Sequence, residues 1–315
     1  MNCACLRFLA TRFERVFGLA KCRLRSIGGR YPSNFLQRLP QVGTHLSRLP
    51  LSFAFTTVLL IAGQAVAQEE REIETDRDSF TPALSTVEQG RVMVEAAYTF
   101  VDNSGVAESH SFPELLLRYG LTENIELRFG SNYEIGGEPN ATSGSGGFDI
   151  GEAFETEPGA LEEEAKVTYG FKVLLLEQHG WVPLSNFTLM GATPTSGKET
   201  ASRMIASYTF GWDFNNEWEW ASAIRYGFIG ASEDSFNSWA PSTVIRVPVS
   251  ERVKLHAEYF GIFTDGAESE TTKHFFSPGV HYLITKDLEV GVRAGWGLND
   301  QSADFFSNVG FGWQF

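Results

Sequence analysis

The sequence predicts an all-β protein, a transmembrane antiparallel β-barrel of about twelve strands with short periplasmic turns and longer outer loops. Apolar and polar residues alternate with a period of two from Arg91 to the last residue, which is typical of strands with one apolar face. Each alternating segment has roughly ten to thirteen residues, the length that a tilted strand needs to cross a bilayer. The connections alternate between tight turns and longer polar loops, as in outer-membrane barrels.

Composition supports β structure and excludes two other classes of protein. The 315 residues include 26 Phe, 9 Tyr, 7 Trp and 31 Gly, and aromatic residues favour strands while glycine favours turns. The net charge of −14 argues against a nucleic-acid partner, because phosphate binding needs a basic face. No apolar run past residue 70 is long enough for a membrane-spanning helix, which argues against an α-helical membrane protein.

Residues 1–67 are predicted to be a leader that is removed. The apolar stretch Leu49–Ala62 follows Arg48 and precedes Ala65-Val66-Ala67, the pattern of a secretory signal peptide with its cleavage site. The alternative, an uncleaved anchor helix, is disfavoured because polar residues end the apolar stretch so soon. We expect an exported chain that begins at Gln68 and resides in the bacterial outer membrane. All three cysteines lie in the leader, which excludes disulfides and thiol chemistry from the remainder.

The exported chain divides into a lead-in, residues 68–90, and a barrel, residues 91–315. The lead-in is polar and acidic and is expected to be a periplasmic segment or a plug. The predicted strands are 91–101, 109–120, 124–134, 165–177, 184–194, 203–213, 217–229, 237–248, 252–263, 273–285, 288–298 and 304–315. The tightest predicted turns are Thr122-Glu123-Asn124, Asn215-Asn216, Ser250-Glu251 and Lys286-Asp287. An even number of strands places both ends of the barrel on the short-turn side.

Period two alone does not say which face of the strands is inside. A membrane barrel turns its apolar set to lipid and its charged set to the lumen, whereas a soluble barrel or sandwich does the reverse. Glycines among the inward charges and aromatic residues near strand ends favour the membrane barrel. These aromatic residues are Trp212, Phe214, Trp218, Trp220, Trp296, Trp313 and Phe315. The expected partners are therefore outer-membrane lipid and the barrel-assembly machinery, the latter through the C-terminal strand that ends at Phe315.

Charged residues on the inward face are the candidates for solute selection. The best candidates for lining the lumen are Glu114, Arg118, Glu126, Arg128, Glu219, Arg225, Glu289 and Arg293. The remaining inward charges are Glu95, Asp213, Glu258, Lys166, Lys172, Arg203, Arg246 and Lys254. Opposite charges in near-equal number allow two interpretations, ion pairs that only hold the strands together or a lining that also conducts a small-molecule solute.

No catalytic residue, metal site or cofactor is predicted. The five histidines after the leader lack metal-ligand spacing, and His256 with Glu258 two residues later is more simply a polar pair in the lumen. The acidic loop 135–164 could attract divalent cations, but it lacks EF-hand spacing and is better interpreted as a solvated loop. A serine nucleophile elbow and a phosphate-binding loop are both missing from the sequence.

Three segments resemble the MetA-pathway phenol-degradation-like family of outer-membrane transporters. They are Glu74–Pro82, Thr86–Arg91 and Pro113–Arg128, and the resemblance extends over essentially the whole exported chain. The family's usual Thr-Asp-Arg-Pro-Asp-Phe-Thr is altered here, with Asp78 in place of Pro and Ser79 in place of Asp. The resemblance implies an outer-membrane β-barrel linked to the uptake of aromatic or other hydrophobic compounds. It implies no catalytic residues.

Asp76 and Arg77 lie just before the first predicted strand. There the lead-in could fold into the lumen as a latch, and its possible partners are Arg118, Arg128, Glu114 and Glu126. The alternative is a periplasmic tether without such contacts. We expect an outer-membrane channel or transporter, not an enzyme, for passive passage of small aromatic or hydrophobic compounds. The alternatives are a structural or adhesive barrel with a blocked lumen and a barrel enzyme that acts on lipid.

Overall fold

The computed structural model describes residues 72–77, 79–137, 140–143, 162–197, 202–214, 218–230, 235–266 and 270–315. The predicted leader and signal peptide, most of the acidic loop and the turn at Asn215-Asn216 lie outside the described residues. No helix within the described ranges is both long and apolar enough to cross a membrane.

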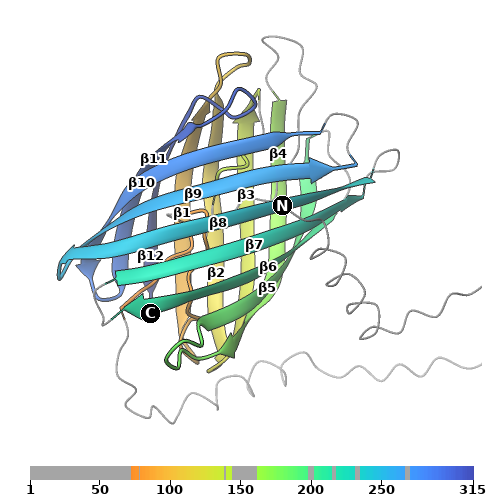
Figure 1. Ribbon diagram of the computed structural model, residues 1–315. Helices are drawn as coiled ribbons and strands as arrows, with labels where there is room; N and C mark the ends of the chain where they lie inside the picture. The colour runs from red at the N-terminus through yellow and green to blue at the C-terminus, as the bar shows by residue number, and fades with distance from the viewer. Residues whose placement is uncertain are drawn as a thin grey trace, which may run out of the picture. The chain divides into compact units, whose positions relative to one another are not determined.

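Twelve strands in the described residues form one closed antiparallel barrel (Figure 1). They are β1 (Val92–Asp102), β2 (Ser109–Thr122), β3 (Ile125–Gly136), β4 (Glu162–Leu176), β5 (Leu184–Ser196), β6 (Arg203–Phe214), β7 (Trp218–Gly230), β8 (Ser235–Ser250), β9 (Val253–Asp265), β10 (Thr272–Thr285), β11 (Leu288–Gly297) and β12 (Phe305–Gln314). The predicted barrel and its strand number are confirmed. The largest shift of a strand end is at β4, which begins at Glu162 rather than at residue 165.

Each strand pairs with its neighbours in sequence, and the first strand pairs with the last. The β1–β12 ladder runs from Met93 opposite Gln314 to Asp102 opposite Phe305. Closure matters because hydrocarbon offers no hydrogen-bond partners, so an open sheet edge in lipid would leave backbone groups unsatisfied. The short turns between β2 and β3, between β8 and β9, and between β10 and β11 each leave two residues outside the strands.

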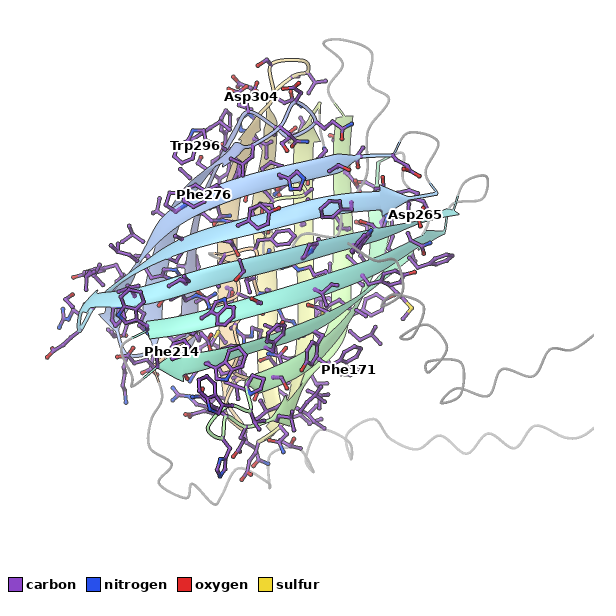
Figure 2. The ribbon with its side chains drawn as sticks, viewed as in Figure 1. Phe171, Phe214, Asp265, Phe276, Trp296 and Asp304 are labelled. Carbon is purple, nitrogen blue, oxygen red and sulfur yellow. The ribbon has the colours of Figure 1, made fainter. Side chains whose placement is uncertain are left out.

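The strand faces have the arrangement of a membrane barrel, with apolar side chains outside and charged side chains inside. On β3, Leu127 and Phe129 are 43 % and 54 % exposed, whereas Glu126 and Arg128, which alternate with them, are 0 % and 6 % exposed. Figure 2 shows side chains such as those of Phe276 and Trp296 on the outer surface. Because such a surface is stable in lipid and unstable in water, the soluble alternative is excluded.

The core lies inside the barrel, between the inner wall and the lead-in. Three groups of buried apolar side chains occupy it, and each includes lead-in residues: Phe80 in the largest, Ile73 and Val87 in the second, and Leu84 in the third. Glycines on the inner wall leave space for this segment. A Cβ atom at Gly312 would lie 2.3 Å from a methyl carbon of Thr75, and one at Gly211 would lie 2.8 Å from Leu84.

Val292 tests the orientation of the strands. It is 55 % exposed and pairs with Val280 and Val309 on the outer surface. We expect Val292→Arg to lower the free energy of unfolding by about 2–4 kcal/mol, because a charge on the lipid face near the bilayer midplane is costly. The measurement is denaturant unfolding of the protein in lipid vesicles.

The control for this variant is Glu251→Arg, which places the same side chain in the turn between β8 and β9. It should leave stability close to that of the wild type. Equal stability of the two variants would contradict a lipid-facing Val292.

Candidate functional site

The lead-in lies within the barrel as a compact loop. Its first arm binds its returning arm through two carboxylates: Asp76 accepts from the backbone N–H of Ala83 at 2.7 Å, and Glu74 accepts from those of Leu84 and Ser85 at 3.0 and 3.2 Å. Phe80 therefore belongs to the turn between the two arms, and it is fully buried. The segment leaves the lumen at Gly90, whose φ of 81° favours glycine, and continues into β1.

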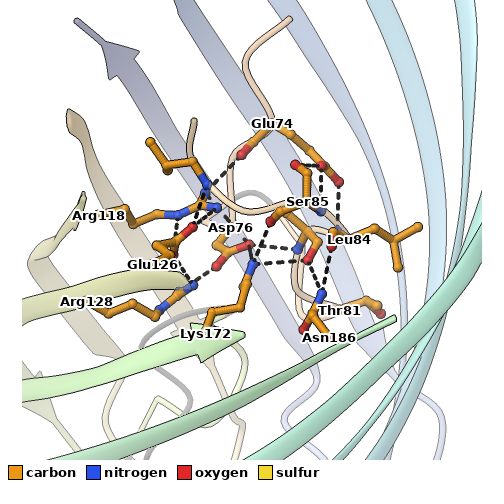
Figure 3. A network of polar contacts seen from close by, with 12 residues as sticks. Glu74, Asp76, Thr81, Leu84, Ser85, Arg118, Glu126, Arg128, Lys172 and Asn186 are labelled. Carbon is orange, nitrogen blue, oxygen red and sulfur yellow. Dashed lines mark hydrogen bonds and ion pairs between the residues drawn. The ribbon is translucent and has the colours of Figure 1, made fainter. Parts of the chain in front are cut away.

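Arg118 on β2 is the centre of a buried charge network on the inner face of strands β1 to β4 (Figure 3). It donates to both carboxylate oxygens of Glu126 at 2.9 Å and to Glu95 at 2.9 Å. It also donates to the backbone carbonyl of Glu74 at 2.9 Å, which fixes the lead-in to the wall. Bidentate and charge-assisted bonds of this kind are among the strongest that side chains make.

Asp76 completes the network from the lead-in. Its carboxylate accepts from Arg128 and lies 3.5 Å from the Lys172 ammonium and 4.0 Å from the Arg118 guanidinium. Burial alone would raise the pKa of Asp76, but the three neighbouring cations outweigh burial and hold the pKa well below its usual range. The carboxylate is therefore ionised, and it balances positive charge contributed by three strands.

Glu114 binds the lead-in and an outer segment at once. It lies 3.4 Å from Arg77, and it accepts from Asn140 at 2.8 Å and from Ser143 at 2.6 Å. Residues 140–143 follow β3 and are buried inside the barrel. In addition, the carbonyl of Thr142 accepts from Arg293. The lumen is thus occupied from the short-turn side by the lead-in and from the other side by this segment.

The opposite wall binds the lead-in mainly through its backbone. Glu258 on β9 accepts from the N–H groups of Phe80 and Thr81 at 2.8 and 2.6 Å, and it lies 3.2 Å from Arg293. The carbonyl of Phe80 accepts from Arg225. Contacts to backbone groups depend on the course of the chain more than on its side chains, so they can be kept when lead-in residues change.

A cavity of about 140 Å³ remains beside the lead-in, near the short-turn end of the barrel. Its lining mixes both charge signs and includes Glu74, Glu219, Arg246, Lys254 and Glu289. Ile73, Glu74 and Thr75 of the lead-in form one side of this cavity. Within the described residues, no group of three His, Cys, Asp or Glu side chains is arranged to hold a metal ion.

The structure brings several sequence-predicted residues together. Asp76 meets Arg128 and Arg118, and Arg77 meets Glu114, whereas Glu126 binds Arg118 and Arg128 rather than either lead-in charge directly. On the other wall, each remaining candidate has its own partner. Glu219 pairs with Arg246, Glu289 accepts from Thr75, Arg225 binds Phe80 and Arg293 binds Glu258.

The sequence alone does not single out every residue of the site. His256, expected to form a polar pair with Glu258 in the lumen, is buried and lies 2.6 Å from His281 on β10. Lys172 and Glu95 belong to the inward set but were not singled out, although alternation along their strands indicates their orientation. Asp213, expected to face inward, pairs in register with Glu219 and lines the cavity at the end of β6, where it is exposed. The sequence pattern does not indicate that Phe80, Phe260, Phe275 and Phe306 are buried inside the barrel, because it assigns apolar residues of the strands to the lipid face.

Comparisons with known proteins give one family and several solved barrels. The family described as "Putative MetA-pathway of phenol degradation" matches residues 75–315. The NanC porin is similar over 70 % of this chain and 98 % of its own, with 9 % identity and a TM-score of 0.44. The KdgM porin is similar over 71 % and 99 %, with 10 % identity and a TM-score of 0.43.

The β domain of the Bordetella autotransporter BrkA is similar over 72 % of this chain and 100 % of its own, with 11 % identity and a TM-score of 0.45. No curated protein matches the chain significantly. The family match covers the lead-in from Thr75 and every strand of the barrel.

Asp76 tests how firmly the charge network binds the lead-in. Asp76→Ala removes one of the buried carboxylates that balance Arg118, Arg128 and Lys172, and breaking a buried pair in this way costs about 3–5 kcal/mol. We expect the lead-in to undock and to become sensitive to protease. The measurement is the rate of cleavage within residues 72–90 of the membrane-inserted protein.

The matched control is Glu72→Ala, which removes a carboxylate from the same segment. Glu72 pairs with Lys254 at 2.8 Å in a partly exposed position, and such pairs contribute about 0–1 kcal/mol. Cleavage of this variant should stay close to that of the wild type. Equal cleavage of both variants would contradict the role of the Asp76 network.

Proposed function

The chain belongs to the "Putative MetA-pathway of phenol degradation" family, and from this premise we propose that it is an outer-membrane channel for the passive passage of small aromatic or hydrophobic compounds. The observation that carries the proposal is the way in which the lumen is closed. A segment that precedes the first strand fills it and is bound by charged wall residues. Withdrawal of that segment would leave a bore lined by both charge signs.

The charged wall supplies the selectivity of the proposed channel. Arg118, Arg128 and Lys172 now face Asp76, and Glu258 faces backbone N–H groups. When the lead-in leaves, water and solutes would take its place as partners of these groups. Rings of fixed charge select permeating solutes by sign and by hydrogen bonding. Movement through such a path follows the concentration gradient.

Docking of the lead-in is proposed as the latch of this channel. Asp76 and Arg77 connect it to β2, β3 and β4 through Glu114, Arg128 and Lys172. The ionic part of this attachment suits a reversible closure, because released charges are solvated by water.

Export and insertion complete the proposal. A signal peptide within residues 1–67 would direct the chain out of the cytoplasm, and the last strand would be recognised by the barrel-assembly machinery. That strand presents Val309, Phe311, Trp313 and Phe315 on its exposed face. An aromatic edge of this kind offers a surface that a partner can bind before the barrel closes.

The second candidate is a structural or adhesive barrel with a blocked lumen. It is favoured by the number of buried partners that the lead-in and residues 140–143 find inside the wall. In that case the lead-in would be a permanent part of the core, and the outer loops would carry the function.

Single-channel recording in a planar bilayer separates the two candidates. We expect the wild-type protein to show rare openings, and a variant that lacks residues 72–87 to show steady ohmic openings, because the main occupant of the lumen is gone. Silence from a deletion variant that is shown to be folded and inserted would support the blocked lumen instead.

Charge selectivity can be measured in the same deletion variant. Arg128→Ala should shift the reversal potential in a salt gradient toward cation preference, because it removes a fixed positive charge from the bore. Lys286→Ala, which removes a positive charge from the turn between β10 and β11, is the control and should leave the reversal potential nearly unchanged. Identical shifts for both variants would exclude a path along the Arg128 wall.

A further inference from the structure

An aromatic site lies inside the lumen. Phe260 on β9 and Phe275 on β10 are directly opposite each other in the β9–β10 ladder and stack with ring centroids 4.8 Å apart. Phe306 on β12 meets both edge-on, at 6.0 and 5.8 Å. All three are buried and point inward, although aromatic residues on a membrane barrel are expected to face lipid.

The ring that fills this site comes from the lead-in. Phe80 stacks on Phe260 with centroids 4.2 Å apart and planes 6° apart. The guanidinium carbon of Arg225 lies 4.0 Å from the centroid of the same ring. A planar π system that contacts both an aromatic face and a cation is the arrangement that recognises aromatic ligands.

The polar groups around the ring are arranged for an acidic substituent. Arg225, besides contacting the ring of Phe80, donates to the carbonyl oxygen of that residue. Arg293 lies over the ring of Phe306, with its guanidinium carbon 5.2 Å from the centroid, and pairs with Glu258. Two guanidinium groups and one carboxylate therefore border the site, and this balance favours an anion.

We propose that this site binds aromatic acids in which two carbons separate the ring from the carboxylate, and that Phe80 is their internal competitor. From its ring to its carbonyl carbon, Phe80 has the carbon skeleton of 3-phenylpropanoate. A free acid of this shape can place its ring on Phe260 and its carboxylate at Arg225, where the charge-assisted bond is stronger than the bond to a carbonyl. The inference rests on the proposed function and names the solute of the same lumen.

Competition with a tethered ring has a measurable consequence. The apparent dissociation constant of a ligand rises as the fraction of protein with an open site falls. Phe80→Ala should therefore bind 3-phenylpropanoate at least about tenfold more tightly than the wild type does, if Phe80 occupies the site about nine-tenths of the time. Calorimetric titration of the purified full-length barrel in detergent measures this change.

Two comparisons make the titration specific. Leu84→Ala removes another fully buried apolar side chain from the same segment, which packs near Ala221 and Val244 and away from the phenylalanines. It should gain far less affinity for the acid than Phe80→Ala does, because the ring of Phe80 still competes for the site. In the Phe80→Ala background, 3-cyclohexylpropanoate should bind at least about tenfold more weakly than 3-phenylpropanoate, because it keeps the charge and length but lacks a planar π face.

A measurement on the wild-type protein makes the test independent of how the variants fold. Saturating 3-phenylpropanoate should displace Phe80 and accelerate protease cleavage within residues 72–90, and 3-cyclohexylpropanoate at the same concentration should not. Equal affinity of Phe80→Ala and the wild type, an equal gain for Leu84→Ala, or equal effects of the two acids would overturn the proposal and leave the phenylalanines as an anchor for the lead-in.

Flux into lipid vesicles distinguishes this inference from the proposed function. Tight binding of 3-phenylpropanoate by Phe80→Ala without flux through the variant that lacks residues 72–87 would refute the channel and support the site. Flux through that deletion variant with no gain in binding by Phe80→Ala would refute the site and support the channel.

Discussion

The absence of hydrogen-bond partners in hydrocarbon is the constraint from which the rest of this structure follows. It requires the twelve strands to close, with β1 against β12, since any free edge would leave backbone groups unsatisfied in lipid. Closure then sends alternate side chains to opposite environments, so apolar residues such as Phe129 face outward and charged residues such as Arg128 face inward. The charges collected in the narrow interior need counter-charges, and the lead-in supplies one of them at Asp76.

The lead-in is bound by interactions that specify its position more than they add stability. Taking Asp76, Arg118 and Arg128 out of water costs much of what their mutual attraction returns, and buried ion pairs are therefore modest net contributors. These interactions do require a specific geometry. The bidentate Arg118–Glu126 contact and the backbone hydrogen bonds to Glu258 fit only one arrangement of the chain. A segment held in this way has one defined docked position.

The barrel could be predicted from the sequence far better than its contents. Period two, with turn residues at regular intervals, locates each strand to within a few residues, since both signals are local. Alternation also indicates that Arg118, Glu126 and Arg293 face inward. The same rule fails for Phe260, Phe275 and Phe306, because it assigns apolar residues to lipid and carries no information about an apolar partner inside. The lead-in has no periodicity, so the docking of Phe80 and the pairing of Glu74 with Leu84 and Ser85 depend on distant strands that local patterns do not report.

Glu114 contacts both occupants of the lumen, which enter from opposite ends of the barrel. Its carboxylate pairs with Arg77 of the lead-in and accepts hydrogen bonds from Asn140 and Ser143 of the segment after β3. Each occupant therefore contacts a side chain that the other also holds in place. Thermodynamic linkage makes any coupling between the two occupants reciprocal: if docking of one changes the affinity of the wall for the other by some factor, docking of the other changes the affinity for the first by the same factor. Displacement of either occupant would leave this one buried carboxylate with fewer partners, so the packing at the two ends of the lumen is coupled through a single side chain.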